Sequence, residues 1–588
     1  MIDAQSFSAN QPLANAAGKP HLHRRLAFEW PLLALLLFVG ALYFGRATVV
    51  PIFGEEPRRG LIAREMLDTG DWITPRVQGI PRLSRPPLQN WLIAAASQLT
   101  GSVEVWAVRL PSLLATLLTV ALIYCVGRHH LSREASFLAG FSYATMYNVL
   151  EYGRLGETEA LFSLFVASSL LLWWLGRQQG WSSWLVWTAG YSCLALGLLT
   201  KGLQAPVYFV GSTWLFLIVT GRWRELLSRG HLIGLVLGGM LASSWQMAFL
   251  VQQGVEKSLE IYFWNVAGRF EETRLLKVLG HWAGYPFEVF LGALFPWTLF
   301  LVPYLAPNYW RALGRYRELA LFLGLSAALC FVVVWLPPGS RSRYYMPLQP
   351  VLALLIGTVW QRLLEQTEAM PAVVKRWWRS VHRAEAGLVI AAIAGLILVG
   401  PQWLSPSVAW LTALALIPCV FLLITTQTHR KALLRGPLAT GLVVAVLFAG
   451  PVLALTDQRC SQIQAAVAAL KADLPEDQPF FSYGQLMHTF LFYYGEPIAL
   501  KEWPDEQETP PSGVFCFHQT TDRQPILPFA WEQMGSVTCD RFQKAHPYDR
   551  IIIGRATSSI QQAHHSDQPE HGKRLLQNAL HTDDSRTE

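Results

Sequence analysis

Two adjacent carboxylates, Glu55 and Glu56, end the apolar segment 47–54 and are followed at once by the basic stretch PRRGLIAREML. A carboxylate beside an apolar segment is partly shielded from water, and such groups often act as an acid or a base. The pair therefore favours a functional acid or base at this point of the chain.

Arginine residues dominate the rest of this loop, with Arg58 close to the carboxylates and Arg76, Arg82 and Arg85 before a Pro-Pro break. A guanidinium group binds phosphate through two parallel hydrogen bonds, which suits a lipid phosphate or a pyrophosphate. We expect the loop to bind a phosphorylated substrate, with Arg58 and Arg85 among its contacts.

The elements that hold these residues must be mostly membrane helices. Of the 588 residues, 52% are hydrophobic and only 15% are charged, a composition that excludes an ordinary soluble enzyme. A bilayer-spanning helix needs about 20 apolar residues, and about thirteen runs approach that length. The predicted spans are 28–46, 104–126, 135–150, 159–175, 184–199, 203–220, 231–251, 286–304, 318–336, 345–361, 386–401, 407–425 and 437–455.

Lysine and arginine residues on alternate loops give the predicted orientation. With the N-terminus inside, the cytoplasmic side receives 20 of the 36 basic residues in the first 455 positions, against 8 acidic residues. The outer side receives 16 basic and 14 acidic residues. We therefore expect a multi-pass protein with a cytoplasmic N-terminus and a C-terminal region outside the membrane.

Charged residues on the predicted outer side gather at 46–103, 151–159, 256–288 and 339–345, and at Lys201. Any one group could anchor a helix end at the membrane interface, but their common side favours a single surface site. Lys201 lies between two apolar runs joined by almost no loop, so it must reach the interface or meet an anion.

The segment EEPRRGLIAREMLDTGDWITPRVQGIPRLSRPPLQNWL resembles the pattern DEARYxxIAREMLxxGDWxxPxxxGxPYFEKPPLxYWL. That pattern is typical of membrane glycosyltransferases related to the bacterial aminoarabinose (lipid A) transferases and, more distantly, to the protein O-mannosyltransferases. The resemblance covers most of residues 28–362. Further matches are VWAVRLPSLLATLLTVALIYCVGR at 105–128, LLTKG at 198–202, FWNVAGRF at 263–270, GALFPWTLFL at 292–301 and YYMPLQPVLALLIG at 344–357.

This resemblance implies a GT-C fold, an all-α polytopic membrane protein with interfacial helices in the first periplasmic loop (47–103). It implies an active site at the outer surface of the bacterial inner membrane. There, a sugar would pass with inversion from a polyprenyl-phosphate donor to an acceptor. A lipid A-like glycolipid, another glycan and a protein all remain open as the acceptor.

By position, the family's aspartate in the first loop falls on Glu55, and its second acidic residue falls on Glu159, with Glu157 as a nearby alternative. Glutamate is one methylene longer than aspartate, so both carboxylates would be displaced relative to the family.

The family's Glu-Lys before Pro-Pro is Ser84-Arg85 here, so a cation is kept and a carboxylate is lost. In relatives, that carboxylate has been associated with a metal, so the sequence predicts no certain cofactor. A divalent metal stays open, with His281 as its candidate ligand because a family histidine often stands there.

Sugar transfer with inversion needs an acceptor oxygen behind the anomeric carbon, a base if that oxygen is a hydroxyl, and cations on the departing phosphate. Glu55 is the candidate base, and Glu159 could orient the acceptor or support positive charge on the sugar. With a phosphate acceptor, no base is needed. The other candidate substrate-binding residues are Glu56, Arg58, Arg85, Arg154, Lys201, Arg269, Arg341, Arg343 and Tyr345.

The last 133 residues differ from the rest, with 11 basic and 18 acidic residues. The basic excess belongs to the membrane part, so it does not predict nucleic-acid binding. We expect a membrane domain over 1–455, a small α/β periplasmic domain over 456–556 and a disordered tail over 557–588. In the small domain, helices are predicted at 465–474 and 485–495, and strands at 479–484, 513–518 and 549–555.

Two other functions remain open from the sequence. A transporter would also have many spans, but its ionisable groups would lie near the bilayer midplane in repeated halves. A non-catalytic relative of the same fold is the second alternative, because glutamate replaces aspartate at both acidic positions. Loss of transfer in Glu55→Ala but not in Glu55→Asp would argue for retained catalysis.

Overall fold

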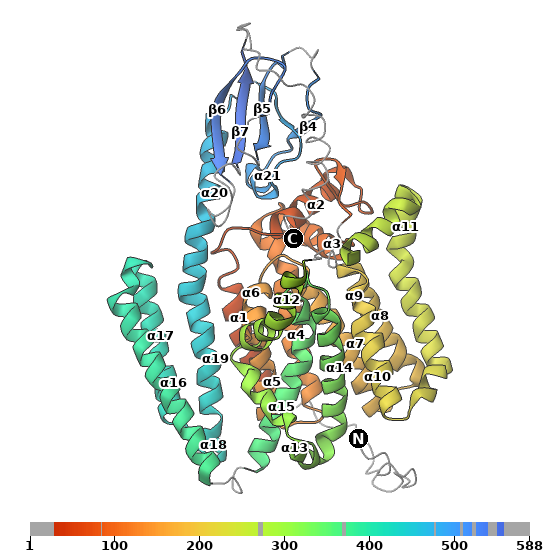
Figure 1. Cartoon of the computed structure of the whole chain (residues 1–588), viewed down its shortest axis with the longest axis vertical. Helices are drawn as coiled ribbons and strands as arrows, with labels where there is room; N and C mark the ends of the chain where they lie inside the picture. The colour runs from red at the N-terminus through yellow and green to blue at the C-terminus, as the bar shows by residue number, and fades with distance from the viewer. Residues whose placement is uncertain are drawn as a thin grey trace.

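The computed structural model describes most of the chain between residues 29 and 557. Helices run side by side along the length of the molecule, and a β-sheet stands at one end of the bundle (Figure 1). The described residues are 29–83, 85–267, 274–366, 372–475, 478–505, 510–519, 525–538 and 550–557.

Eight helical segments among these residues are long and apolar enough to cross a membrane. The chain is therefore a mostly helical, multi-span membrane protein. The segments are α4 (Val105–Gly127), α7 (Glu159–Gln178), α8 (Ser183–Lys201), residues 229–260 of α11 (Arg229–Ala267), η7 with α14 (Gly314–Tyr316, Arg317–Trp335), α16 (Ala372–Leu398), α17 (Pro406–Ile424), and α19, η10 and α20 in succession (Arg435–Leu447, Phe448–Val452, Leu453–Asp473).

The other five predicted spans are helical but shorter or interrupted, so their crossing of the bilayer stays a prediction. Pro206, Pro296 and Pro347 lie at the interruptions, where proline removes a helical hydrogen bond. The segments are α1 (Trp30–Phe44), α5 and α6 (Arg133–Ala144, Tyr147–Tyr152), α9, η2 and α10 (Gln204–Pro206, Val207–Gly211, Ser212–Val219), η5 and η6 (Glu288–Ala293, Trp297–Leu305), and η8 and α15 (Ser342–Leu348, Gln349–Glu365). Short connecting helices are η3 (Trp223–Leu227), α12 (Leu275–Phe287), α13 (Pro307–Ala312), η9 (Gly400–Gln402) and α18 (Arg430–Leu433).

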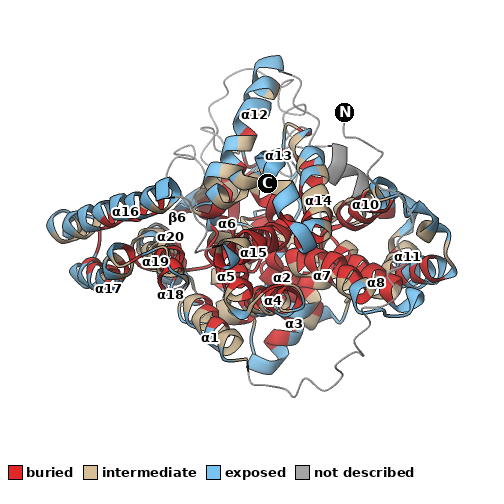
Figure 2. Cartoon of the chain, turned by 90° about the horizontal axis from the view of Figure 1, so that it is seen from below, coloured by how far each residue is buried: buried red, intermediate tan, exposed pale blue. Residues whose placement is uncertain are grey.

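The buried core lies in the middle of the bundle. Figure 2 shows buried residues concentrated in α4, α5, α7 and α15, whereas α16, α17 and α11 form an exposed periphery. Large apolar side chains such as Leu388, Leu414 and Phe421 are exposed on α16 and α17. Lipid is as apolar as these side chains, so the periphery is suited to face a bilayer.

The first long loop forms two helices and a small hairpin between the bundle and the sheet (Figure 1). They are α2 (Glu56–Thr69), β1 (Arg76–Val77), β2 (Ile80–Pro81) and α3 (Leu88–Thr100). The sequence predicts both helices, but it also predicts that the polar side of α2 is exposed to water. Arg58 and Arg59 are each only 3% exposed, because α3 and the C-terminal part pack around the start of α2.

The C-terminal part is a five-stranded mixed sheet with the order β4-β3-β5-β7-β6. β3 is parallel to β4 and β5, and β7 is antiparallel to β5 and β6. β3, β5 and β7 lie in the predicted strand regions, whereas β4 and β6 were not predicted. Of the tail predicted to be disordered, only residue 557 is among the described residues. The strands are β3 (Phe480–Tyr483), β4 (Ala499–Lys501), β5 (Val514–Gln519), β6 (Trp531–Thr538) and β7 (Arg550–Ala556).

Helix α21 (His488–Tyr494) packs the C-terminal part against α2. Gly60 allows the close approach, since a Cβ atom there would lie 2.6 Å from Cε2 of Phe492. The backbone N–H of Ile52 donates to the Tyr493 hydroxyl at 2.7 Å, and Gln78 Nε2 donates to Ser482 Oγ at 3.1 Å. The sheet is thereby held beside the start of α2.

Candidate active site

A tight turn places the first carboxylate at the start of α2. Gly54 has a φ of +65°, in the left-handed region that favours glycine. A Cβ atom at Gly54 would lie 3.3 Å from Oε1 of Glu157, which reaches the turn from the loop before α7. Pro57, in the first turn of α2, has the fixed φ that suits a helix start. The turn thus brings Glu55 next to the second acidic segment.

Segments far apart in the sequence meet around Glu55 and line a small cavity. They are the start of α2, the Pro-Pro segment before α3, the loop from α6 to α7, and η8. The free space is about 10 Å³, close to the volume of one water probe. The lining residues are Glu55, Arg59, Arg85, Glu157, Thr158, Glu159 and Arg343.

Buried ion pairs connect these segments. Lys201 Nζ donates to Glu159 Oε1 at 2.7 Å, and both residues are less than 5% exposed. Arg343 donates from Nη1 to Glu157 Oε2 at 2.8 Å and holds its Nε 3.6 Å from Glu159 Oε1. Arg58 pairs with Glu55 across one turn of α2. The structure thus brings together Glu55, Glu159, Arg58, Arg85, Lys201 and Arg343, as the sequence predicts.

Among the residues that the structure describes, cations outnumber carboxylates at this site. The groups that line the cavity or pair with its lining are the carboxylates Glu55, Glu157 and Glu159 and the cations Arg58, Arg59, Arg85, Lys201 and Arg343. A buried charge is costly unless it is paired. The surplus positive charge therefore favours an anionic ligand.

Arg59 shows this surplus most directly. Burial, and after it the positive charge of Arg58, lower the pKa of Arg59 to about 10, and the Glu55 carboxylate offsets only part of this effect. The Nε atom of Arg59 is buried, and it finds no hydrogen-bond acceptor within the described part of the chain. A phosphate oxygen beside Arg59 would raise the pKa of its guanidinium and would accept a hydrogen bond from its Nε atom.

The carboxylates of the site differ in their pKa. Burial alone would raise the pKa of Glu55, but the positive charges of Arg58, Arg59 and other arginines outweigh it and hold the pKa below its ordinary value. The pKa of Glu157 is raised above its ordinary value, first by burial and then by the negative charge of Glu159. Glu55 is therefore ionised at neutral pH, whereas Glu157 holds its proton more readily.

Glu56 is not part of this cavity. Its carboxylate is fully buried and accepts two hydrogen bonds from Arg109, from Nε and Nη2, each at 2.7 Å. The backbone N–H of Gly156 also donates to Glu56 at 2.7 Å. Arg109 additionally donates to the carbonyl oxygens of Ala47 and Val50. Glu56 and Arg109 thus connect the first loop, α4 and the loop before α7, and they position the segment that carries Glu55.

Three further predicted binding residues, Arg154, Arg341 and Tyr345, do not line the cavity. Arg154 is buried 4.0 Å from Glu151 and packs over the ring of Phe448. Arg341 is exposed, and Tyr345 is buried with its hydroxyl donating to the Ala327 carbonyl at 2.9 Å. Arg269 lies outside the described residues. Tyr344, which precedes Tyr345 in the chain, contacts the site residue Lys201 instead. The centroid of its ring lies 5.0 Å from Lys201 Nζ.

The donor groups do not fit a divalent metal. His281 Nε2 lies 3.0 Å from the Trp335 carbonyl oxygen, and the His281 ring packs on Tyr285. Among the described residues, no group of three or more His, Cys, Asp and Glu side chains could hold a metal ion. The carboxylates around the cavity are paired with arginine and lysine, which would repel a second cation.

Sequence reasoning missed Arg59 and Arg109, and it ranked Glu157 second to Glu159. Arg109 gave a signal, because an arginine inside a predicted span needs a buried partner. Arg59 gave little signal, because some arginine side chains of such a helix at a membrane surface are expected to be exposed to water. Glu157 could only be distinguished from Glu159 by the turn that directs it towards Gly54.

Comparison with known proteins gives a consistent result. Residues 84–247 match the family model described as dolichyl-phosphate-mannose-protein mannosyltransferase. The undecaprenyl phosphate-alpha-4-amino-4-deoxy-L-arabinose arabinosyl transferase of Edwardsiella ictaluri is 30% identical over 340 residues, covering 55% of this chain and 59% of the relative. The enzyme of the same name from Pseudomonas aeruginosa PAO1 is 28% identical over 373 residues, covering 61% and 65%. The chain thus spans less than two thirds of the length of these relatives.

The fold is similar to that of ArnT from Cupriavidus metallidurans bound to undecaprenyl phosphate. The TM-score is 0.66 at 17% sequence identity, and the match covers 91% of this chain and 99% of ArnT. The apo state of the same protein gives a TM-score of 0.65. The expected membrane fold with a C-terminal sheet is thereby confirmed.

Proposed function

We propose that the chain is an inverting glycosyltransferase of the membrane superfamily that contains the aminoarabinose transferases and the protein mannosyltransferases. It takes a sugar from a polyprenyl-phosphate donor and passes it to an acceptor at the periplasmic face of the bacterial inner membrane. The observation that carries this proposal is that buried cations outnumber carboxylates among the described residues around Glu55, an arrangement that suits the phosphate of a lipid-linked donor.

The reaction joins an acceptor oxygen to the anomeric carbon of the sugar and breaks the bond from that carbon to the donor phosphate. Negative charge then develops on the departing polyprenyl phosphate. Arg59, Arg85 and Arg343 are placed to stabilise that charge in a site largely closed to water. Because the free space is about 10 Å³, the phosphate replaces some of the present ion pairs rather than filling an open pocket.

The acceptor proton goes to a carboxylate if the acceptor is a hydroxyl. A base works best when its pKa lies near the working pH, which favours Glu157 over Glu55. Glu55, kept ionised by its arginines, orients the acceptor or supports positive charge on the sugar. A phosphate acceptor is already ionised, so no proton is transferred. Both carboxylates then only orient the substrates.

The names of the relatives suggest the first donor to test, undecaprenyl phosphate aminoarabinose. The resemblance of the first loop implies a lipid A-like glycolipid as the first acceptor. The assay supplies membranes containing this protein with labelled polyprenyl-phosphate sugars and follows which outer-face fraction gains label. We expect Arg343→Ala to lower the rate by about a hundredfold, in the range seen when one charge-stabilising group is removed.

Arg46→Ala is the control, since it also removes an arginine, and Arg46 lies just before the first loop without lining the cavity. It should keep the full transfer rate. Transfer unaffected by Arg343→Ala would refute the assigned site. Absence of transfer from every donor, with the protein folded and inserted, would favour a non-catalytic relative.

A further inference from the structure

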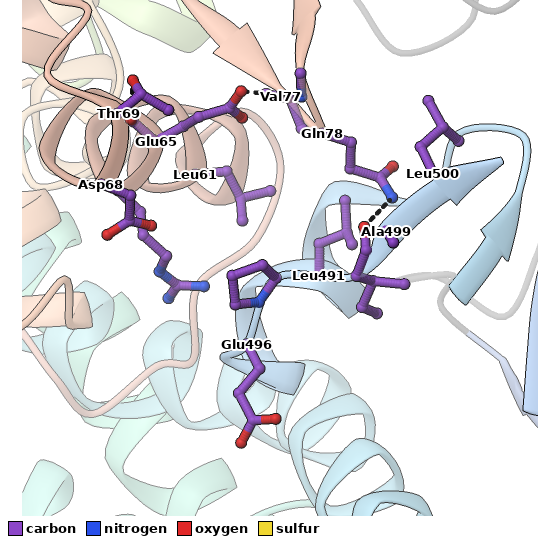
Figure 3. Close-up of a pocket in the computed structure, with 14 residues that line it drawn as sticks. Leu61, Glu65, Asp68, Thr69, Val77, Gln78, Leu491, Glu496, Ala499 and Leu500 are labelled. Atoms are coloured by element: carbon purple, nitrogen blue, oxygen red, sulfur yellow. Dashed lines mark hydrogen bonds between the residues drawn. The ribbon is translucent and has the colours of Figure 1, made fainter. Parts of the chain in front are cut away.

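A second, larger cavity of about 430 Å³ lies between α2 and the C-terminal sheet. Its size is in the range of small-molecule binding sites. Figure 3 shows Glu65, Asp68 and Thr69 extending from α2 on one side, and Leu491, Ala499 and Leu500 facing them from the C-terminal part. Val77, Gln78 and Gly79 of the β1–β2 hairpin close the third side.

We propose that this cavity binds the unphosphorylated saccharide part of the acceptor. The inference rests on the proposed glycosyltransferase function and names the class of acceptor that the same site uses. Three observations support the proposal. The lining combines planar polar side chains with apolar walls, the one cation among the described lining residues is opposed by a carboxylate, and helix α2 runs from this cavity to the active site.

The lining suits a saccharide because it offers both kinds of contact. Leu61, Leu491 and Ile498 form apolar walls for the C–H faces of a sugar ring. Glu65 and Asp68 offer carboxylate oxygens for hydroxyl or amino groups. The Gln78 amide is already bound to Ser482, Ile498 and the backbone N–H of Leu486, and it shapes the wall. Two of these side chains are held in place by backbone contacts. Gly79 N–H donates to Glu65 Oε1 at 2.9 Å, and Gln78 Nε2 donates to the Ile498 carbonyl at 3.4 Å.

A phosphate group does not fit the same lining. Among the described residues that line the cavity, Arg64 is the one cation, and it is opposed by Asp68 and packed over Phe492 at 5.5 Å. Glu496 is already paired with Lys471 at 2.7 Å, outside the cavity. The phosphate-binding cations therefore belong to the first site, and the second site recognises hydroxyl and amino groups.

Helix α2 connects the two sites. Arg58, Leu61, Glu65 and Asp68 are spaced by three or four residues and so share one face of the helix. Seven residues separate Arg58 from Glu65, a distance of about 10 Å along the axis, which a short oligosaccharide can span. Leu491 lines the cavity on α21, and His488 lies one turn earlier on the same helix, among Arg58, Arg59 and Arg82. A saccharide in the cavity would thus extend towards Glu55.

Direct binding tests the cavity without any transfer reaction. The probes are diglucosamine, maltose and glucosamine 6-phosphate, added to the full-length protein in detergent and followed by saturation-transfer NMR or calorimetry. We expect both disaccharides to bind and glucosamine 6-phosphate to bind no better than either. Leu500→Trp, which fills the cavity from β4, should weaken disaccharide binding about tenfold, equivalent to about 1.4 kcal/mol.

Two further variants keep the test independent of folding. Asp68→Asn changes an exposed side chain at the end of α2 and should also weaken disaccharide binding. Met534→Trp adds the same bulk on the exposed surface of β6 and should leave binding unchanged. Disaccharide binding equal in wild type and Leu500→Trp, or tightest binding by glucosamine 6-phosphate, would overturn the assignment.

The transfer assay separates this inference from the proposed function. If both are correct, Leu500→Trp raises the KM for the labelled acceptor about tenfold and leaves kcat nearly unchanged. If transfer occurs but Leu500→Trp alters neither KM nor binding, only the cavity assignment fails. If disaccharides bind but no donor supports transfer, only the glycosyltransferase function fails.

Discussion

Lys201 and Glu159 are a buried ion pair at the active site, and each needs the other to remain charged there. Removing one partner of such a pair leaves an uncompensated charge and typically costs about 3–5 kcal/mol. We predict that Lys201→Met lowers both the free energy of unfolding and the rate of transfer. Denaturation in detergent measures the first quantity, and the labelled-sugar assay measures the second.

The double variant Lys201→Met/Glu159→Gln distinguishes the structural role of the pair from its chemical role. Removing both charges should restore most of the lost stability, because no unpaired charge remains. Transfer should stay low, since the site has lost a cation and a carboxylate. Full activity in the stable double variant would contradict a role for the pair in the reaction.

Glu157 makes donor binding depend on pH. Because its folded-state pKa is raised, Glu157 is protonated more often in the folded than in the unfolded chain. The stability that this provides is present at low pH and is lost as pH rises through the folded-state pKa. Deprotonation also adds negative charge beside the phosphate site. We predict that binding of a polyprenyl-phosphate sugar, whose phosphodiester keeps one charge, weakens as pH rises above neutrality.

The control for this prediction is Glu157→Gln, which keeps the size of the side chain but cannot ionise. Its binding isotherms should show a flatter dependence on pH than those of the wild type. An unchanged pH dependence in Glu157→Gln would assign the titration to another group.

At the scale of secondary-structure elements, the contact between α2 and α21 holds the active site and the second cavity together. A side chain at Gly60 would collide with Phe492. We predict that Gly60→Val separates the two helices, lowers the unfolding free energy by about 1–3 kcal/mol as overpacking does, and raises hydrogen exchange in α21. Gly239→Val is the matched control, because no atom lies within 4 Å of a Cβ built there. Equal exchange in both variants would show that this contact does not hold α21.

The helices and the main strands follow from sequence because apolar runs and alternating patterns are local signals. β4 has only three residues, Ala499–Lys501, and β6 is largely exposed, so neither has the pattern of a buried strand. The burial of Arg58 and Arg59 was not predictable for a different reason. It depends on α21, a helix more than 400 positions away, which no local pattern connects to α2.

In the candidate site, residue types could be predicted from sequence, but the directions of the side chains could not. Spacing and resemblance identified Glu55, Arg85 and Lys201, which the structure brings to one place. They also predicted that Glu56 binds substrate, because the sequence does not show that two adjacent carboxylates point in different directions from one helix start. Glu56 turns to Arg109, a partner 53 positions away, while Glu55 faces the cavity.

At the scale of the whole molecule, the arrangement of charge sets the expected orientation. The sheet and the active site share one end of the bundle (Figure 1), and the predicted cytoplasmic loops with most lysine and arginine residues lie between the other helix ends. Positively charged loops are retained in the cytoplasm. The same distribution predicts that the site lies outside the cytoplasm.

Cysteine labelling in intact cells tests this orientation. We predict that a membrane-impermeant maleimide labels Glu532→Cys, on the exposed strand β6, more than it labels the unsubstituted chain. Arg224→Cys, exposed in the short helix η3 after α10, should be labelled only after the membrane is opened. Both positions are solvent-exposed, so the difference reports the side of the membrane rather than burial. The reverse pattern would invert the topology, place the sheet in the cytoplasm and leave the proposed periplasmic acceptor out of reach.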